Sequence, residues 1–124
     1  MSRRLLVMAL PLFLTACAGD RVHARPDVQS TEEGQATWYG ERHQGKRTAN
    51  GERFDLNKLT AAHRTLPFGT RVRVVHLRTG KSVVVRINDR KGKGGLIDLS
   101  KAAAKRIGLV KEGRTQVRLE VLGR

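Results

Sequence analysis

The chain has 124 residues, so one domain is expected, and its single cysteine excludes a scaffold held together by disulfides. Its 25 lysines and arginines against 11 acidic residues give a formal charge of +14, which indicates either an anionic partner or a merely solvated basic surface. With one Trp, one Tyr and three Phe, the chain has little aromatic surface for base stacking, which argues against a nucleic-acid partner.

The first sixteen residues have the pattern of an export signal. Arg3 and Arg4 precede an apolar run over 5–14, and about ten residues are too few for a permanent membrane span. The run ends in Leu14-Thr15-Ala16-Cys17, which resembles the bacterial lipobox, where the signal is cut before a cysteine that is then lipidated. We therefore predict a signal peptide over 1–16 and lipidation of Cys17.

Residues 17–33 are the predicted lipidated N-terminus and a polar, flexible tether. Ala18 follows the cysteine, at the position where an aspartate would retain a lipoprotein in the inner membrane. By resemblance to lipoprotein sorting in Gram-negative bacteria, an alanine at this position favours the outer membrane. The expected location is the cell envelope, at the periplasmic face of the outer membrane. Export leaves an anionic lipid or an anionic wall polymer as the partner.

The folded domain is predicted over 34–122. A strand is expected over 35–39, a loop over 41–58 and a helical turn over 59–63. The β-branched segments 71–77 and 82–87 form a hairpin around the turn 78–81. After a glycine-rich basic loop over 88–95 come a strand over 96–99, a helix over 101–107 between Ser100 and Gly108, and a strand over 115–121. A mainly β, small closed barrel fits best, because closure removes exposed strand edges.

No metal or cofactor is predicted. The histidines at 23, 43, 63 and 76 lack ligand spacing and cysteine partners, and there is no phosphate-binding loop or nucleophile elbow. What remains is a set of acidic residues with one histidine: Glu52, Asp55, Asp89, Asp98 and His63.

Carboxyl groups across a cleft suit glycosidic bond cleavage, which needs one protonated acid and negative charge near an oxocarbenium-like transition state. Asp98 lies between Ile97 and Leu99 at the end of an apolar strand. Such an apolar setting raises the pKa of a carboxyl group, as a general acid at neutral pH requires.

Structural roles remain open for every member of this set. Asp98 can bond the backbone at the helix start, Asp89 can belong to a turn or an ion pair, and Asp55 can cap the turn after Phe54. His63 can be a satisfied core histidine, and Glu52 can be solvated.

Five blocks between 34 and 121 resemble the rare lipoprotein A family. They are Ala36-Thr37-Trp38-Tyr39-Gly40, Thr48-Ala49-Asn50-Gly51-Glu52 with Phe54-Asp55, Thr60-Ala61-Ala62-His63 with Thr65 to Thr70, Val85 with Ile87 to Arg90, and Ile97-Asp98-Leu99-Ser100 with Ala102 to Ala104. The resemblance implies a six-stranded double-psi β-barrel with one or two short helices.

The resemblance also implies an endolytic lytic transglycosylase that cleaves peptidoglycan strands, preferably without stem peptides, and leaves 1,6-anhydro-N-acetylmuramic acid. The site carried over is Asp98 as acid and base, Glu52 and His63 for positioning and for tuning the acid, and Asp89 for ordering the loop. Substrate-binding residues are expected at Trp38, Tyr39, Asn50 and Arg90, in a protein expected to be monomeric.

The chain departs from the family where relatives have Asn-Asp-Arg-Gly-Pro and a longer insert. Here Lys91-Gly92-Lys93-Gly94-Gly95 follows Arg90. A shorter, more cationic loop beside Asp89 and Asp98 keeps a second hypothesis open, a non-catalytic glycan-binding outer-membrane lipoprotein of the expansin-like type.

Overall fold

The structure is a computed structural model, and it describes residues 27–124. The predicted signal peptide, the lipidation of Cys17 and the tether residues 17–26 lie outside the described residues. Within 27–124, no helix has both the length and the apolar character needed to cross a membrane.

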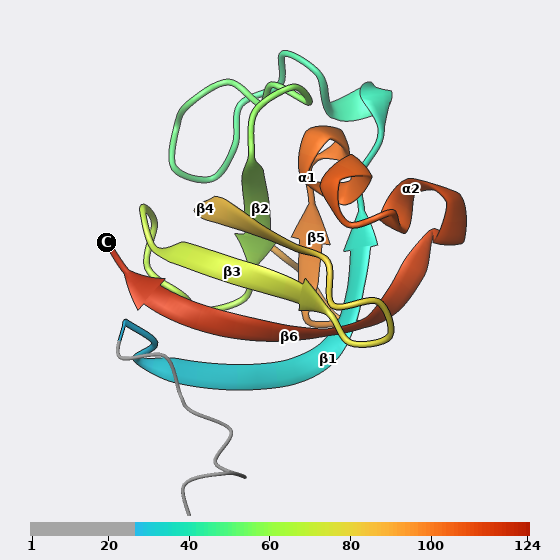
Figure 1. The fold of residues 1–124 in the computed structure, drawn as a ribbon. Coiled ribbons are helices and arrows are strands. Elements are labelled where there is room, and N and C mark those ends of the chain that lie inside the picture. Colours follow the sequence, from blue (N-terminus) through green and yellow to red (C-terminus); the bar gives the residue numbers. More distant parts are fainter. Residues whose placement is uncertain (1–26) are drawn as a thin grey trace, which may run out of the picture.

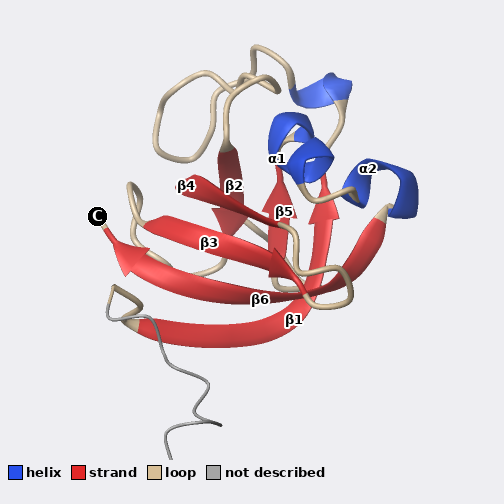
Figure 2. Cartoon of the chain, viewed as in Figure 1, coloured by secondary structure: helices blue, strands red, loops and turns tan. Residues whose placement is uncertain are grey.

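The described residues form six strands and three short helical segments (Figures 1 and 2). In chain order these are β1 (Ser30–Trp38), the 3-10 helix η1 (Glu41–His43), β2 (Thr60–His63), β3 (Arg71–His76), β4 (Ser82–Arg90), β5 (Ile97–Leu99), α1 (Lys101–Arg106), α2 (Leu109–Glu112) and β6 (Arg114–Gly123).

The six strands close into a barrel in the order β1-β5-β2-β4-β3-β6. The long strands β1 and β6 run antiparallel and curve side by side along the bottom of Figure 1. β1 pairs parallel with β5, and β2 pairs parallel with β4, so two crossover connections are built into the barrel. The predicted six-stranded closed barrel with short helices is confirmed.

Two predicted segments were wrong. β1 begins at Ser30, so the residues 30–33 that were assigned to the tether pair with β6 and belong to the barrel. Residues 60–63, predicted as a helical turn, form β2, because they fit between β4 and β5 and all four are buried there. These long-range pairings override the weak local preference.

β4 continues to Arg90, three residues beyond its predicted end, and contains a bulge. Ala61 pairs with Ile87, but the next residue, Ala62, pairs with Asp89, so Asn88 is the extra residue. The burial alternation of β4 breaks at the same point, where Ile87 and Asn88 are both buried. The bulge turns Asp89 to the face on which Ala62 lies.

The hydrophobic core fills the barrel and extends under α1 and α2. Alternate residues of β3 and β4 point inward, which is the period-two pattern that predicted the hairpin. Ser100 caps α1 by accepting a hydrogen bond from the Ala103 amide, as predicted. Gly108 then takes a left-handed conformation between α1 and α2. The fully buried core side chains are Ala36, Ala61, Val72, Val74, Ile87, Ile97, Leu99, Ala103, Ala104, Leu109, Val117 and Leu119.

Candidate active site

Asp89 and Asp98 share a surface cavity of about 220 Å³ at one end of the barrel. β4, β5 and β2 meet here: Ala62 of β2 is in register with Asp98 on one side and with Asp89 on the other. In a sheet, residues that pair directly point to the same face, so both carboxylates flank the small Ala62 side chain. The cavity is lined by Tyr39, His43, Ala62, Asp89, Arg90, Lys91, Gly92 and Asp98.

The Asp98 carboxylate has polar rather than apolar neighbours. Its Oδ1 accepts a hydrogen bond from the Thr37 hydroxyl, which lies opposite it on β1, and lies 3.2 Å from the Lys91 ammonium. The flanking Ile97 and Leu99 point into the core, so the apolar sequence context does not surround the carboxyl group. Both contacts use Oδ1, and within residues 27–124 no hydrogen bond to Oδ2 is present.

Asp89 forms hydrogen bonds that hold the loop containing Glu52. Its Oδ1 accepts hydrogen bonds from the Ala49 and Arg90 amides, both at 2.9 Å. The loop-ordering role expected for Asp89 agrees with these contacts. Asp89 nevertheless lines the cavity, so its second oxygen adds negative charge beside Asp98.

Glu52 is not among the residues that line the cavity. Its Oε1 accepts from the Asn88 amide nitrogen at 2.7 Å and pairs with Arg86 at 2.8 Å. Burial opposes the charged form of Glu52, but the hydrogen bonds from Asn88 and Arg86 outweigh it and set the pKa of this carboxyl below its usual value. Glu52 is therefore ionised at neutral pH and supplies negative charge rather than a proton.

His63, a predicted site residue, lines a different cavity from the one that holds Asp98. It follows Ala62 on β2 and so points to the opposite face, toward a separate cavity of about 220 Å³ lined by Glu32, Arg64, Thr65, Gly95 and Leu96. Its Nδ1 accepts from the Thr65 and Leu66 amides, both at 3.1 Å, so the proton lies on Nε2, which donates to Glu32 at 3.1 Å.

The environment of His63 disfavours its cationic form. Burial lowers the pKa of the imidazole, and the pairing with Glu32 only partly offsets this effect. A neutral histidine bound to two backbone amides holds a turn, which is the core-histidine alternative left open by the sequence.

Asn50 and Asp55 shape the same loop. Asn50 Oδ1 accepts from the Thr48 hydroxyl at 2.6 Å and from the Glu52 amide at 3.1 Å. Asp55 Oδ1 accepts from the Asn57 amide at 3.0 Å, as expected of a residue that caps a turn. Asn50, predicted to bind substrate, is thus occupied in holding Glu52.

Arg90 lines the cavity and is fixed by three contacts. Its guanidinium lies 4.0 Å above the Phe68 ring and donates to the Leu66 carbonyl at 2.8 Å and the His63 carbonyl at 3.3 Å. These contacts join the end of β4 to the loop after β2.

Tyr39 contributes a buried hydroxyl group with no hydrogen-bond partner among residues 27–124. Burial raises its pKa, and the nearby charges of Asp89 and Asp98 raise it further, so the hydroxyl stays protonated and can donate. Its ring packs against Phe54 at 4.6 Å and meets His43 edge-on at 5.0 Å. The Tyr39 hydroxyl is thus a buried donor near two carboxylates, without a hydrogen-bond partner among residues 27–124.

His43 is the imidazole that the structure brings to the cavity, and sequence analysis did not select it. It lies in a polar segment without an apolar period, and edge contacts with the Tyr39 and Phe54 rings help to fix its place. The pair Tyr39–His43 also borders a second cavity, so the two cavities are neighbours.

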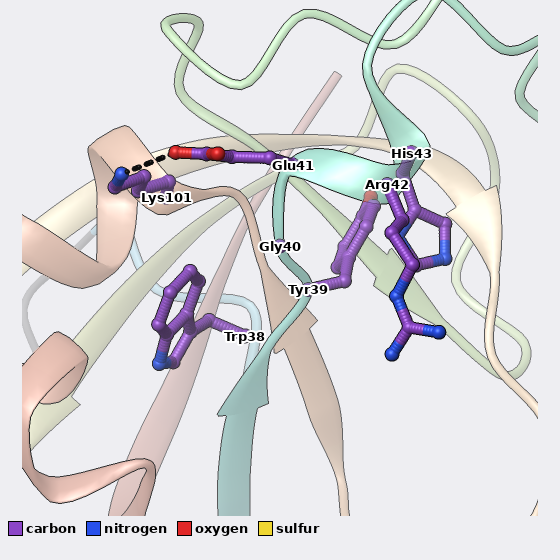
Figure 3. A pocket seen from close by; sticks show the side chains of 7 residues that line it. All are labelled: Trp38, Tyr39, Gly40, Glu41, Arg42, His43 and Lys101. Atoms are coloured by element: carbon purple, nitrogen blue, oxygen red, sulfur yellow. Dashed lines mark hydrogen bonds and ion pairs between the residues drawn. The ribbon is translucent and has the colours of Figure 1, made fainter.

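The second cavity has a volume of about 460 Å³ and contains Trp38 (Figure 3). The Trp38 indole and the Tyr39 ring project to opposite sides of the end of β1, as successive strand residues do. An ion pair of 3.0 Å between Lys101 and Glu41 spans the side next to Trp38. An aromatic face with the cations of Arg42 and Lys101 suits an anionic sugar.

Between residues 27 and 124, no group of three or more histidine, cysteine or acidic side chains is arranged to hold a metal ion. The cavity provides a carboxylate with one open oxygen, a second carboxylate, a protonated phenol and two cations. This set can move a proton at a sugar oxygen.

Comparison with known proteins defines the class. Residues 31–119 match a double-psi β-barrel family model described as lytic transglycolase. The Streptomyces papain inhibitor has a similar fold, with a TM-score of 0.63 and 21% identity over 77% of this chain and 96% of that one. Cerato-platanin 3 from M. perniciosa also has a similar fold, with a TM-score of 0.53 and 11% sequence identity. The match covers 73% of this chain and 93% of that one. At these identities the two structures support the fold alone.

Sequence relatives identify the family. A probable endolytic peptidoglycan transglycosylase RlpA of Synechocystis sp. is 50% identical over 94% of this chain and 37% of its own length. An endolytic peptidoglycan transglycosylase RlpA of Neisseria meningitidis is 47% identical over 83% of this chain and 44% of its own length. The endolytic peptidoglycan transglycosylase RlpA of Vibrio cholerae is 50% identical over 74% of this chain and 36% of its own length. The chain thus spans less than half the length of these relatives.

The molecule is a double-psi β-barrel with a cavity bearing two carboxylates at one end. It belongs to the lytic transglycolase family, and the resemblance to rare lipoprotein A is confirmed.

Proposed function

We propose that this protein is an endolytic peptidoglycan transglycosylase that cleaves the bond between N-acetylmuramic acid and N-acetylglucosamine. The observation that carries the proposal is the position of Asp98, in a cavity beside a second carboxylate and with Oδ2 uncommitted. The names of the relatives at about 50% identity support the same activity.

Asp98 acts as acid and then as base. The protonated carboxyl gives its proton to the glycosidic oxygen as the bond from C1 to that oxygen breaks. The resulting carboxylate takes the proton from the muramyl C6 hydroxyl, whose oxygen bonds to C1 and closes the 1,6-anhydro ring. No water is consumed, and Asp98 ends in its starting form.

Other residues prepare this step. The Asp89 and Glu52 carboxylates supply negative charge near the positive charge that develops at the sugar ring. Tyr39 lines the same cavity, although its hydroxyl oxygen is buried. Trp38 lies in the neighbouring cavity, where its face stacks on a sugar of the bound strand.

The activity is tested with the full chain in detergent and glycan strands stripped of peptides, with soluble anhydromuramyl products as the readout. Asp98→Asn is expected to lower product formation by about a hundredfold or more, because it removes the general acid. Asp55→Asn, which changes a carboxylate at a turn away from the cavity, should leave it intact. Unchanged product formation by Asp98→Asn would refute the role given to Asp98.

A second candidate is a glycan-binding barrel without turnover. The ion pair between Lys91 and Asp98 favours it, because the cation occupies the proposed acid. In this case the chain would pellet with the strands and release no anhydromuramyl product. Trp38→Ala should weaken pelleting under either function.

We also propose that Cys17 carries the lipid and holds the protein, as a monomer, at the periplasmic face of the outer membrane. The lipobox pattern and Ala18 support this placement. Radiolabelled palmitate should mark the chain but not Cys17→Ala, which should move to the soluble fraction of a cell lysate. Label on Cys17→Ala, or a dimeric mass in light scattering, would contradict the proposal.

A further inference from the structure

Lys91 is a nearly buried cation inside the cavity that holds Asp98. It is the first residue after β4, its side chain is 8% exposed, and its Nζ lies 3.2 Å from Asp98 Oδ1. Gly95 lies against this side chain, since a Cβ there would be 3.5 Å from Lys91 Cε, which is ordinary contact distance.

This ion pair conflicts with acid catalysis. Asp98 must carry a proton before it can give one to a glycosidic oxygen, and a protonated Asp98 no longer balances the Lys91 charge. A nearly buried ammonium without a counter-ion is costly. Neighbouring groups are not paired with Lys91: Arg90 is itself a cation, and among residues 27–124 the ion pair of Lys91 is with Asp98 and not with Asp89, whose Oδ1 accepts from two backbone amides.

The substrate can supply the missing negative charge. N-acetylmuramic acid carries a lactyl ether on O3 of the same ring whose C1 bond breaks. Where no peptide is attached, this ether ends in a carboxylate. An ammonium next to Asp98 is therefore well placed to meet the carboxylate when the glycosidic oxygen reaches Asp98.

We propose that Lys91 is a specificity residue that binds the free lactyl carboxylate of N-acetylmuramic acid, exchanging its contact with Asp98 for one with the substrate. The inference rests on the proposed function. A muramyl residue whose lactyl group is an amide offers no charge, so Lys91 stays on Asp98 and the acid stays occupied. Binding of the lactyl carboxylate by Lys91 then both selects the substrate and frees Asp98 to act as the acid.

The test compares two forms of the same glycan strands, with free lactyl carboxylates or with these converted to primary amides. The full chain in detergent should prefer the free acids by about tenfold to a hundredfold in kcat/KM, the range expected for one charge-assisted hydrogen bond. Lys91→Met should bring this preference close to one, and Lys91→Arg should keep most of it.

Lys93→Met is the matched control. It removes the same charge from the same loop, but Lys93 is exposed and does not line the cavity, so the preference should persist. If Lys91→Met changes activity on both strands equally and keeps the preference, the proposal is wrong.

Affinity for the two strands is measured in parallel by co-sedimentation. A chain that releases no product from either strand refutes the proposed activity, and the affinity ratio still tests Lys91. A ratio near one for the unmodified chain, or a ratio unchanged by Lys91→Met, would overturn the assignment of Lys91 as the carboxylate-binding residue.

Discussion

At the residue scale, His63 and His76 are held by the same arrangement of hydrogen bonds. Each histidine ends a strand, and its Nδ1 accepts from the amides two and three residues later. Each Nε2 contacts a glutamate, Glu32 for His63 and Glu112 for His76 at 2.7 Å. The repetition indicates that His63 fixes the turn after β2, while the imidazole near Asp98 belongs to His43.

The depressed pKa of His63 makes stability depend on pH. The unfolded chain takes up a proton on this residue near pH 6.5, whereas the folded chain does so only at lower pH. Because the unfolded state binds more protons in this window, the contribution of His63 is present above about pH 6.5 and is lost as pH falls toward the folded-state pKa.

His63→Gln should lower the free energy of unfolding at pH 7.5 by about 1–3 kcal/mol, because two backbone amides lose their acceptor. The same variant should show a shallower fall in stability between pH 7.5 and pH 5. Urea denaturation at a series of pH values measures both effects. Parallel curves for the variant and the unmodified chain would contradict the assignment.

At the element scale, short segments and one irregularity build the site. β2 has only four residues, yet it sets the register of both β4 and β5 around Ala62. Without the bulge at Asn88, Asp89 would lie opposite His63 and point away from Asp98. The bulge also directs the Asn88 amide to Glu52, so one extra residue positions two carboxylates.

Ser100 joins α1 to the segment before β2. Its hydroxyl donates to the Lys58 carbonyl at 2.6 Å and accepts from the Ala103 amide at 3.3 Å, and the residue is fully buried. Ser100→Ala should therefore cost about 1–3 kcal/mol of unfolding free energy, because the helix cap and the hydrogen bond to the Lys58 carbonyl are both lost. Ser82→Ala, at an exposed position in β4, is the control and should cost little. Equal losses in chemical denaturation would refute this role.

At the scale of the whole molecule, closure depends on β6. This last strand pairs with β1 on one side and β3 on the other, so it completes the barrel and covers the core (Figure 1). The first and last strands of the domain are thus neighbours, and folding requires contacts between residues about ninety positions apart. Such non-local pairing makes stability a property of the entire barrel.

Leu119 of β6 is fully buried in this core. Leu119→Ala should lower the free energy of unfolding by about 2–5 kcal/mol, because it leaves a cavity between β1 and β3. Leu77→Ala removes the same atoms from a side chain that is 40% exposed and should cost far less. Thermal unfolding of the two variants measures the difference, and a similar shift in both would contradict this account of the core.

Much of the fold followed from local patterns. The alternation in 71–76 and 82–87 predicted the hairpin, and Ser100 with Gly108 predicted α1, because these signals lie within a few residues of the elements they define. β2 was missed because Thr60-Ala61-Ala62-His63 has no strong preference of its own, and only its partners β4 and β5 make it a strand.

The sequence by itself determined the barrel class and the family, and it indicated Asp89 and Asp98 as candidates, because the blocks that resemble the family and the strand periods can be read directly along the chain. Only the tertiary structure decided which side chains meet. His63 lines a different cavity from Asp98, His43 lines the cavity of Asp98, and the Lys91 ammonium pairs with Asp98. The reason is geometric: one residue of strand register or one bulge reverses the face of a side chain, and register is fixed by pairing between distant segments.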